Sequence, residues 1–524
     1  MTRAAGRTLY RGASWHSPAR LPSADVEAAA VAFLVVDGMV AWRGPDAEAD
    51  RHVDAAAQVV QLGGALVTPA FVDAHAHLSQ TGAGLRGVEL GTARSLHEAL
   101  SRIESAARAN AGRPVHAQNW DESRWPERRP FTAAELDRAT YGGVVYAPRV
   151  DGHSAVVSSA LAAAARLSEA EGRMPDGLII TEAHHRARVA FAASVTRGQR
   201  RDDIALALRS AAAAGIALVQ ENGGPVVSSA EDFSDVLDVA GQPGSPQVIG
   251  YWAELVDTPE RARALALRHQ ARGLGGDLNV DGSLGSRTAS LREDYTDRPG
   301  HRGHAFLTAA QVCEHVEACT RAGIQAGFHV IGDLGVDTVL AGMQTAATRT
   351  GLEAFRAARH RLEHVEMIDA DGVRLLAALG VAASVQPAFD ACWGGDSGMY
   401  AERLGRERAR GMNPVRSMLD AGVRVALGSD SPVTRFAPWE ALRACLQHHD
   451  DDQRTSVEEA FRAHTVGGYE AAGMDGHGVL RVGGAATFAV WDRVGGGLPD
   501  LSGSLPPPRA LQTVVDGTVA HELT

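Results

Sequence analysis

A chain of 524 residues and 55.0 kDa is too long for one ordinary core, so we expect one large domain of barrel size with additions. With 45% hydrophobic and 22% charged residues it is globular, and no apolar run approaches the roughly 18 residues of a membrane span. The formal net charge of −12 argues against a nucleic-acid partner, because binding to the phosphate backbone needs clustered positive charge.

The two ends of the chain have the same character. The first 64 residues hold short β-like runs such as VAFLVVDGMVAW, and the last part holds ATFAVWD and LQTVVDGTVAH, without a helical pattern. We therefore predict that residues 1–64 and 478–524 pair into one small β-sandwich domain. Because no apolar segment follows the basic residues at the start, we predict no signal peptide and a cytoplasmic location.

Between these ends, from residue 65 to 477, short apolar runs alternate with helical stretches rich in Ala, Leu and Arg. The pattern is typical of parallel strands joined by helical crossovers. Eight runs fit it, at 65–72, 215–220, 247–255, 277–280, 325–330, 360–365, 381–386 and 423–428. We therefore predict an α/β protein with a (β/α)8 TIM barrel, whose active site lies at the carboxyl ends of the strands. Residues from about 85 to 200 interrupt the alternation and predict an inserted α/β subdomain after the first strand.

The first strand ends in FVDAHAHLSQTG, where His75 and His77 stand one residue apart. Such residues of a strand point to the same side, and two imidazoles projected together suit a metal site. Later strands end in His329 of FHVIGD, His364 of RLEHVE and Asp430 of LGSDSP. Taken one at a time, His329 and His364 are better explained as core histidines, and Asp430 as a turn residue. Together, five such residues at one rim of a barrel favour a metal centre.

The order of PAFVDAHAH, DGSLGSRTA, FHVIGD, RLEHVE, SVQP and LGSDSPV resembles the amidohydrolase superfamily. Within it, the chain is similar to the branch of YtcJ-like proteins and N-substituted formamide deformylases, the amidohydrolase 3 type. The resemblance covers nearly the whole chain, because NWDESRWPERRPFTAAELDRA, DGHSAVVSSAL and GVLRVGGAATFAVWD match that branch as well. It implies a metal-dependent hydrolase of C–N bonds other than peptide bonds, acting on a small N-acyl amine or N-substituted formamide.

The resemblance also implies roles for the five residues. His75 and His77 bind one metal ion beside Asp430, and His329 and His364 complete its surroundings or bind a second ion. An ion such as Zn²⁺ lowers the pKa of bound water to roughly 7 and polarises the substrate carbonyl. Asp430 is expected to act as general base and then return the proton to the departing amine. Zn²⁺ is our first expectation, although these ligands suit manganese and iron as well.

One departure from the family pattern decides the expected number of ions. The chain contains no lysine, so its 51 basic residues are all arginine, and Asp277 stands where relatives with two metals carry a carbamylated lysine. Aspartate is shorter and could bridge two ions only if the backbone moved inward. We therefore expect one ion, with His364 donating a hydrogen bond to the substrate carbonyl and a weak second ion near Asp277 or Glu221 as the alternative. The ligands of the single ion are expected to be His75, His77, His329 and Asp430.

Four further residues are candidates for contact with the substrate: Trp120, His153, Arg287 and Gln220. Trp120 and His153 lie in the inserted segments, where the related branch places pocket residues; a role in turn and core is an equal alternative. Arg287 could clamp a carboxylate or be solvated, and Gln220 ends the second strand, where related sequences often show His. The expected partner is a small-molecule substrate, with no membrane, and a homodimer is a reasonable state for a barrel enzyme.

Two other functions stay open. Deamination of a heterocycle also uses one ion held by His-x-His, a fifth-strand His and an eighth-strand Asp. The usual deaminase, however, has Glu three residues after the fifth-strand His, and this chain has Gly332 there. The third function is a non-catalytic metal- or ligand-binding protein. Asp430 argues against it, because a mere binder does not require a proton carrier.

Overall fold

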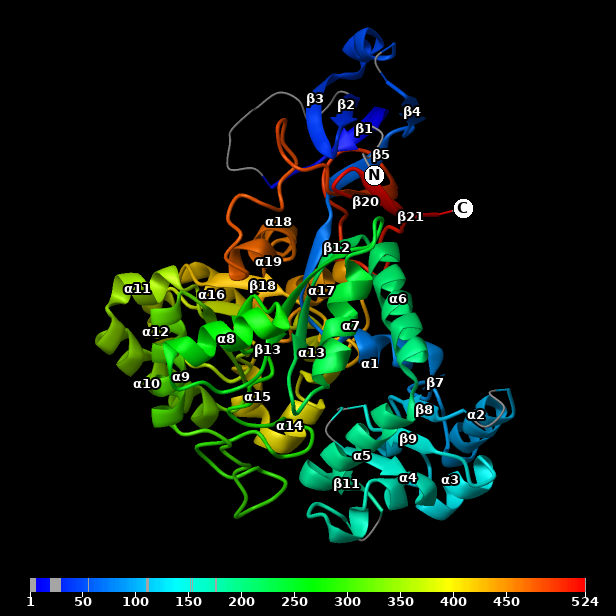
Figure 1. The fold of residues 1–524 in the computed structure, drawn as a ribbon, viewed down its shortest axis with the longest axis vertical. Helices are drawn as coiled ribbons and strands as arrows, with labels where there is room; N and C mark the ends of the chain where they lie inside the picture. Colours follow the sequence, from blue (N-terminus) through cyan, green and yellow to red (C-terminus); the bar gives the residue numbers. More distant parts are fainter. Residues whose placement is uncertain are drawn as a thin grey trace.

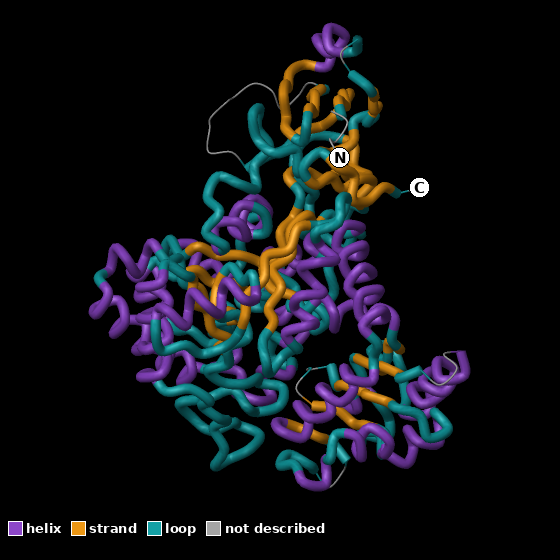
Figure 2. Tube along the Cα trace, viewed as in Figure 1, coloured by secondary structure: helices purple, strands orange, loops and turns teal. Residues whose placement is uncertain are grey.

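The structure is a computed structural model, which describes residues 6–18, 30–54, 56–109, 113–150, 152, 154–174 and 177–523. Its strands form three sheets, which occupy different parts of the molecule (Figures 1 and 2). A sheet built from both chain ends lies at the top of the view, a barrel in the middle, and an inserted sheet at the lower right. No helix in these described ranges is long and apolar enough to cross a membrane.

Eight parallel strands form the central sheet in the spatial order β18-β17-β16-β15-β14-β13-β12-β6. Its strands are β6 Phe71–Ala76, β12 Ile216–Gly223, β13 Gln247–Trp252, β14 Gly273–Leu274, β15 Gln325–Val330, β16 Arg361–His364, β17 Ala382–Val385 and β18 Arg424–Leu427. The first and last strands meet just beyond β18, where the backbone N–H of Asp430 donates to the carbonyl of His75 at 2.8 Å. The arrangement is that of a (β/α)8 barrel, as the alternation of the sequence predicts.

Helices surround the barrel strands. They are α1 Leu78–Arg86, α6 Arg197–Ala213, α7 Ala230–Ala240, α8 Pro259–His269, α9 Ala309–Ala322, α10 Asp333–Thr350, α11 Leu352–Ala357, α12 Ala370–Leu379, α13 Pro387–Trp393, α14 Met399–Leu404, α15 Arg406–Arg410, α16 Val415–Asp420, α17 Pro438–Leu446, α18 Val457–Ala463 and α19 Val466–Ala471. Helix α9 shows how the sequence sets them. Thr308 and Gln311 form a capping box at its start, and Gly323 ends it with a φ of 71°. Val312, Val316 and Cys319 recur at helical spacing and are buried.

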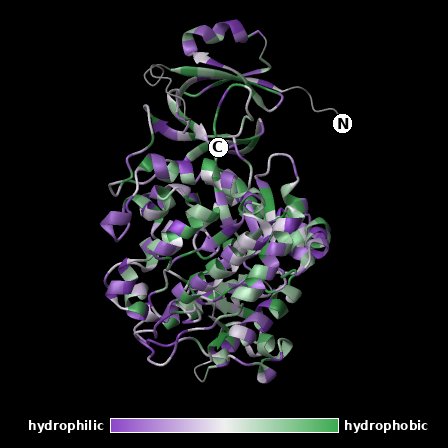
Figure 3. Cartoon of the chain, turned by 90° about the vertical axis from the view of Figure 1, so that its left-hand side faces the viewer, coloured by the Kyte–Doolittle hydropathy of each residue, from purple (hydrophilic) through white to green (hydrophobic). Residues whose placement is uncertain are grey.

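Both ends of the chain contribute to one sheet. Its strands are β1 Arg7–Trp15, β2 Val31–Val36, β3 Met39–Pro45, β4 Gln58–Gln61, β5 Ala65–Pro69, β19 Phe488–Val494, β20 Ala510–Val515 and β21 Thr518–Glu522. Strand β5 joins the two ends, because it pairs with both β1 and β19. Tyr10 stacks on Phe33 at 4.8 Å between ring centroids, and Phe488 meets both rings edge-on. The short helix η1 Asp46–His52 is mostly hydrophilic and lies at the far end of this sheet (Figure 3).

The segment between α1 and α6 forms the inserted subdomain. Its strands β7 Val88–Glu89, β8 Val115–Gln118, β9 Val145–Pro148, β10 Ser154–Val157 and β11 Ile179–Ile180 pair in the order β11-β10-β9-β8-β7. Its helices are α2 Leu96–Ala109, α3 Ala133–Ala139, α4 Ser159–Ala164 and α5 Thr181–Ser194. Trp120, Trp125 and Phe131 pack together in a core of its own. The subdomain is therefore a separately packed unit that enters and leaves the barrel beside the first strand.

Two strands differ from the sequence prediction. The run 65–72 is divided, because β5 belongs to the terminal sheet and the barrel strand starts only at Phe71, so the expected boundary at residue 64 was too early. The fourth strand is Gly273–Leu274, and the predicted run 277–280 meets strand β15 only through an isolated parallel bridge between Asn279 and His329. After the fourth strand, a Cβ on Gly275 would lie 2.3 Å from the amide nitrogen of Gly327, and one on Gly276 would lie 2.2 Å from Asn222 Oδ1. Only glycine permits so close an approach, which carries the chain inward just before Asp277.

Candidate metal centre

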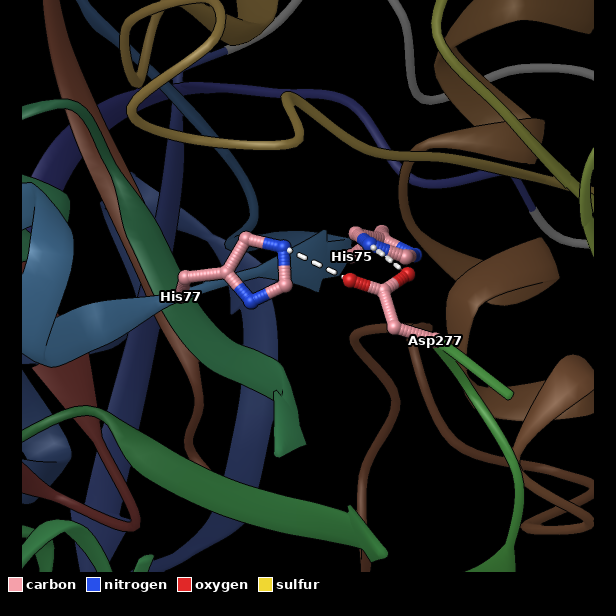
Figure 4. A group of neighbouring side chains, drawn as sticks. All are labelled: His75, His77 and Asp277. Carbon is pink, nitrogen blue, oxygen red and sulfur yellow. Dashed lines mark ion pairs between the residues drawn. The ribbon is translucent and has the colours of Figure 1, made fainter. Parts of the chain in front are cut away.

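Six side chains meet at the carboxyl ends of the barrel strands. Their potential ligand atoms form three overlapping groups, within each of which the atoms lie no more than 4.8 Å apart. The groups are His75 with His77 and Asp277, His75 with His364 and Asp430, and Asp277 with His329 and His364. Figure 4 shows the first group, in which the carboxylate of Asp277 lies between the rings of His75 and His77. The structure thus brings together all five residues expected at this rim and adds Asp277.

The distances suit ligands that share an ion. His75 Nε2 lies 3.4 Å from Asp277 Oδ1 and 3.5 Å from Asp430 Oδ1. His77 Nε2 lies 3.2 Å from Asp277 Oδ2 and 3.2 Å from Asp430 Oδ1. Four ligand atoms placed tetrahedrally at about 2.1 Å from Zn²⁺ lie about 3.4 Å from one another. These nitrogen–oxygen separations therefore match the spacing that one small divalent cation imposes.

Each of the four histidines holds its outer ring nitrogen against an acceptor. The contacts are His75 Nδ1 to Glu363 Oε2 at 3.0 Å, His77 Nδ1 to Asn222 O at 2.9 Å, His329 Nε2 to Gly282 O at 3.3 Å and His364 Nδ1 to Gln386 Oε1 at 2.8 Å. Because an acceptor favours the ring proton on the outer nitrogen, it is the inner nitrogen of each neutral ring that faces the centre and can offer a lone pair to a cation. Three atoms of the centre, His75 Nε2, His364 Nε2 and Asp277 Oδ1, are buried and have no hydrogen-bond partner among the described residues. Lone pairs and carboxylates that face one another in this way fit a cation.

The backbone explains how His364 reaches the centre. Residues 361 and 363 of strand β16 share the barrel-facing side, and both are fully buried. His364 and Val365 then adopt left-handed conformations, with φ values of 68° and 52°. Such conformations are uncommon for residues other than glycine and concentrate at functional sites. They end the strand alternation, so that His364 as well as Glu363 serves the same centre.

The pKa values of the centre follow its charges. Burial opposes a positive charge on His75, but the carboxylates of Asp277 and Asp430 raise its pKa well above the usual value. Burial also lowers the pKa of His77 and of His329, but the neighbouring carboxylates, Asp277 above all, together raise both pKa values by more, so that each is above the usual value. Burial favours neutral carboxyl groups, yet the imidazoles hold the pKa of Asp277 well below its usual value and lower that of Asp430. The centre therefore attracts positive charge, and protons and metal ions compete for its nitrogen lone pairs.

We expect Zn²⁺ to stabilise the protein more at about pH 8 than at about pH 6, because the ion needs unprotonated rings. His75, His77 and His329 have raised pKa values without metal, so the stability they contribute is complete below 6.5 and is lost as the pH rises through the raised values. Zn²⁺ binding gains strength over the same range. Unfolding temperatures with and without Zn²⁺ across this range measure the effect. A Zn²⁺-induced shift that does not change with pH would contradict competition between proton and metal.

Asp277 reaches farther into the centre than its side-chain length alone predicts. Its Oδ1 lies between the two sides of the centre, 3.4 Å from His75 Nε2 and 3.8 Å from His329 Nδ1. The expectation assumed an ordinary strand backbone, whereas Gly275 and Gly276 carry the chain inward at this point. A shared carboxylate is thus geometrically available to ions on both sides.

His364 also differs from its expected role. The contact between Nδ1 and Gln386 Oε1 places the ring proton on the outer nitrogen, so Nε2 has no hydrogen to donate to a substrate carbonyl. Burial and the neighbouring rings of His329 and His75 lower its pKa to about 3, which keeps the ring neutral. These contacts suit His364 to hold a cation rather than to donate a hydrogen bond.

The two polar residues expected at the end of the second strand have partners within the protein. Gln220 is fully buried; its Oε1 accepts a hydrogen bond from Arg361 Nη1, and its Nε2 donates to Gly468 O at 2.7 Å. We therefore correct its expected substrate contact. Glu221 Oε2 accepts from the backbone N–H of Leu78 at 2.8 Å, and burial raises its pKa to about 7. Glu221 belongs to none of the three ligand groups found among the described residues.

The remaining candidates lie away from the six-residue cluster or outside the described residues. Trp120 is fully buried in the core of the inserted subdomain and donates its Nε1–H to Ala147 O at 2.8 Å. Arg287 pairs with Asp297, whose two carboxylate oxygens each lie 3.1 Å from its Nε. Both contacts favour the structural alternative for these two residues. His153 lies outside the described residues.

The groups that orient the histidines were not predicted from the sequence. Glu363 directly precedes His364 in RLEHVE, and Gln386 stands at the end of the seventh strand in SVQP. Both positions at strand ends were a signal that could have found them. Asn222 acts through its backbone carbonyl, which no residue type would have indicated.

The sequence model described as the amidohydrolase family matches residues 58–521. The chain is 26% identical to the protein LONG AFTER FAR-RED 3 of Arabidopsis thaliana, with 92% of this chain and 87% of that protein covered. It is 25% identical to the N-substituted formamide deformylase of Arthrobacter pascens, with 94% and 95% covered. It is 23% identical to the protein YtcJ of Bacillus subtilis (strain 168), with 83% and 85% covered. The crystal structure of an uncharacterized metal-dependent hydrolase from Pyrococcus furiosus has a similar fold, with a TM-score of 0.73, 23% identity, and 93% of this chain and 99% of that chain covered.

Proposed function

The chain belongs to the amidohydrolase family, as its motifs indicated, and we propose that it hydrolyses the C–N bond of a small N-acyl amine or N-substituted formamide. The observation that carries the proposal is the centre itself, where four imidazole lone pairs and two carboxylates meet at the strand ends. Similarity over nearly the whole chain to an N-substituted formamide deformylase supports this substrate class. The products are a carboxylic acid, or formate, and an amine.

His75, His77, Asp277 and Asp430 are the residues that would hold a divalent cation, and we propose Zn²⁺ because imidazole and carboxylate are among its usual ligands. Asp277 replaces His329 in the expected ligand set, because the ligand atom of His329 groups with Asp277 and His364 and not with His75 and His77. Such a cation, when bound, polarises a substrate carbonyl and lowers the pKa of water to roughly 7. The inner nitrogens of His75 and His77 are kept free for it by Glu363 and by the carbonyl of Asn222.

Asp430 is the proposed general base. Its side chain is 12% exposed, compared with 0% for His75, so water and substrate reach it more easily than the rings beneath. Although burial favours the neutral carboxyl group, the imidazoles lower its pKa, so the carboxylate is ionised at neutral pH. It would accept a proton from the attacking water at a carboxylate oxygen. As the C–N bond breaks, it would deliver that proton to the amine nitrogen.

We expect purified protein to keep about one ion per chain after dialysis and to bind a second only in excess metal. The reason is that a position with more negatively charged ligands binds a cation more tightly. The first position offers two carboxylates and two imidazoles, whereas the second offers two imidazoles and the shared carboxylate of Asp277. Elemental analysis of protein prepared without chelators or histidine tags measures the ratio. Two ions that resist dialysis equally would mean that the positions are equivalent, and none would remove the metal centre.

The position that distinguishes a deaminase also supports hydrolysis of an amide. A Cβ on Gly332 would lie 2.1 Å from the carbonyl oxygen of Ser290, so no glutamate fits there unless the backbone moves. The site therefore lacks room for the proton-carrying side chain expected of the usual deaminase.

Turnover of a panel of substrates tests the proposed function directly. Zn²⁺-loaded protein should release amine and carboxylate from N-acyl amines or N-substituted formamides and should release no ammonia from heterocyclic amidines. Ammonia release from heterocycles alone would favour the deaminase. Bound metal without turnover of either class would favour the non-catalytic alternative.

A further inference from the structure

A buried ion pair lies directly beneath the metal centre, inside the barrel. Arg361 and Glu363 are both fully buried on strand β16. Arg361 Nε donates to Glu363 Oε1 at 2.6 Å, and its Nη2 donates to Glu363 Oε2 at 2.8 Å. The pair is bidentate, which fixes the carboxylate in one orientation. The interior of such a barrel is usually filled with branched apolar side chains, so a charged pair at this level calls for an explanation.

The pair is tied to other strands and to the first metal residue. Arg361 Nη2 also donates to the carbonyl of Ala74 at 2.8 Å, directly before His75 in the chain. Its guanidinium carbon lies 4.6 Å from the ring centroid of Tyr251 on strand β13. Glu363 Oε2 then lies 3.0 Å from His75 Nδ1. The arginine therefore holds both carboxylate oxygens, and one of them, Oε2, also meets the imidazole of His75.

We propose that Glu363, oriented by Arg361, is a positioning residue that fixes the ring of His75 with its proton on Nδ1 and thereby sets the metal affinity of the centre. The inference rests on the metal centre proposed above. Burial of an isolated carboxylate costs free energy, and the positive charge of Arg361 balances the negative charge of Glu363. The unit of Arg361 and Glu363 therefore orients His75 without adding net charge, which leaves Asp277 and Asp430 to balance the cation.

A purely structural role for the pair makes a different prediction. Replacing both members of a buried ion pair by apolar residues of similar size is often neutral or favourable for stability, whereas removing one member leaves a buried charge. The double variant Arg361→Met/Glu363→Leu removes the pair and the contact to His75 together. The double variant Arg361→Met/Glu363→Gln removes both charges but keeps an oxygen that can accept the Nδ1–H of His75.

We expect Arg361→Met/Glu363→Leu to bind Zn²⁺ about 10–100-fold more weakly than wild type, the usual effect of losing the carboxylate behind a ligating histidine. Competition with a chromophoric chelator measures the affinity, and the unfolding temperature of metal-free protein shows that the variant folds. Arg361→Met/Glu363→Gln should recover part of the affinity, because the acceptor is restored. Tyr251→Phe is the matched control, since it alters the same layer but leaves the contact between Glu363 and His75 in place.

Equal Zn²⁺ affinity in folded Arg361→Met/Glu363→Leu and wild type would overturn the proposal, as would the absence of any recovery with glutamine at 363. If neither double variant folds, Glu363→Asp decides, because it keeps the negative charge beside Arg361 but withdraws the carboxylate from His75 by one methylene. Weaker Zn²⁺ binding by folded Glu363→Asp supports positioning, and unchanged binding refutes it. The measurements use metal alone, so they do not depend on the proposed substrate; a wild-type chain that binds no Zn²⁺ would instead reject the metal centre itself.

Discussion

Replacing Asp430 by asparagine should lower kcat by about 10²–10⁴-fold, the usual contribution of a general acid–base group, while most of the metal stays bound. His75 and His77 both meet the same oxygen of Asp430, Oδ1, so an amide can keep an oxygen toward the cation, but it cannot accept a proton at neutral pH. Asp430 also has a left-handed backbone, with a φ of 54°, which asparagine tolerates better than most residues. We therefore expect a folded, metal-loaded protein that turns over poorly. Steady-state kinetics on the best N-acyl amine or formamide, with metal content measured on the same sample, check this result.

Asp333→Asn is the matched control for Asp430→Asn. Asp333 is also a carboxylate that follows a barrel strand, but its Oδ1 accepts backbone N–H groups from Arg292 and Leu334 at 2.9 Å. Turnover in this control should stay close to that of wild type. If Asp430→Asn kept full activity with full metal, another group would have to carry the proton, and the proposed mechanism would fail.

Hydrophobic patterning was sufficient to predict the barrel, because buried parallel strands leave continuous apolar runs in the sequence. It failed at two places where the backbone is unusual. The run 65–72 is apolar throughout, so nothing in its composition reveals that it passes from the terminal sheet into the barrel near Ala70. The fourth strand has two residues, Gly273 and Leu274, and the run 277–280 that follows it meets strand β15 only through the bridge of Asn279 to His329, so the prediction placed the strand too late in the chain.

The candidate site was predictable where each residue ends a strand. His75, His77, His329, His364 and Asp430 meet because parallel strands bring their carboxyl ends to one rim. The place of Asp277 was not predictable, since it depends on how closely Gly275 and Gly276 approach neighbouring strands. Gln220 was misjudged for a related reason. Its expected position at the end of the second strand suggested a substrate contact, but strand β12 continues to Gly223, and Gln220 pairs inside the barrel with Arg361, which is distant in the chain.

Replacing Asp277 by asparagine should weaken Zn²⁺ binding by at least about 100-fold, since loss of a group one step behind a ligand already costs 10–100-fold. Asp277 takes part in two of the three ligand groups, and its two oxygens face His75 and His77 at 3.4 and 3.2 Å. The amide would present an N–H group where a carboxylate oxygen now faces a cation, and it removes one of two negative charges. Metal titrations should therefore show a weakened first site and no second one, because the second position shares this carboxylate.

Glu221→Gln is the comparison that gives the Asp277→Asn result its meaning. Both residues are acids near the centre, and the sequence offered both as companions of a second ion. Glu221, however, faces the backbone N–H of Leu78, and an amide oxygen can accept that hydrogen bond as well. Its substitution should therefore leave Zn²⁺ affinity and stoichiometry unchanged. Equal losses of Zn²⁺ affinity in the two variants would point to a general effect of negative charge around the centre. Loss of affinity in Asp277→Asn alone would identify Asp277 as the carboxylate that links the two sides of the metal centre in a chain without lysine.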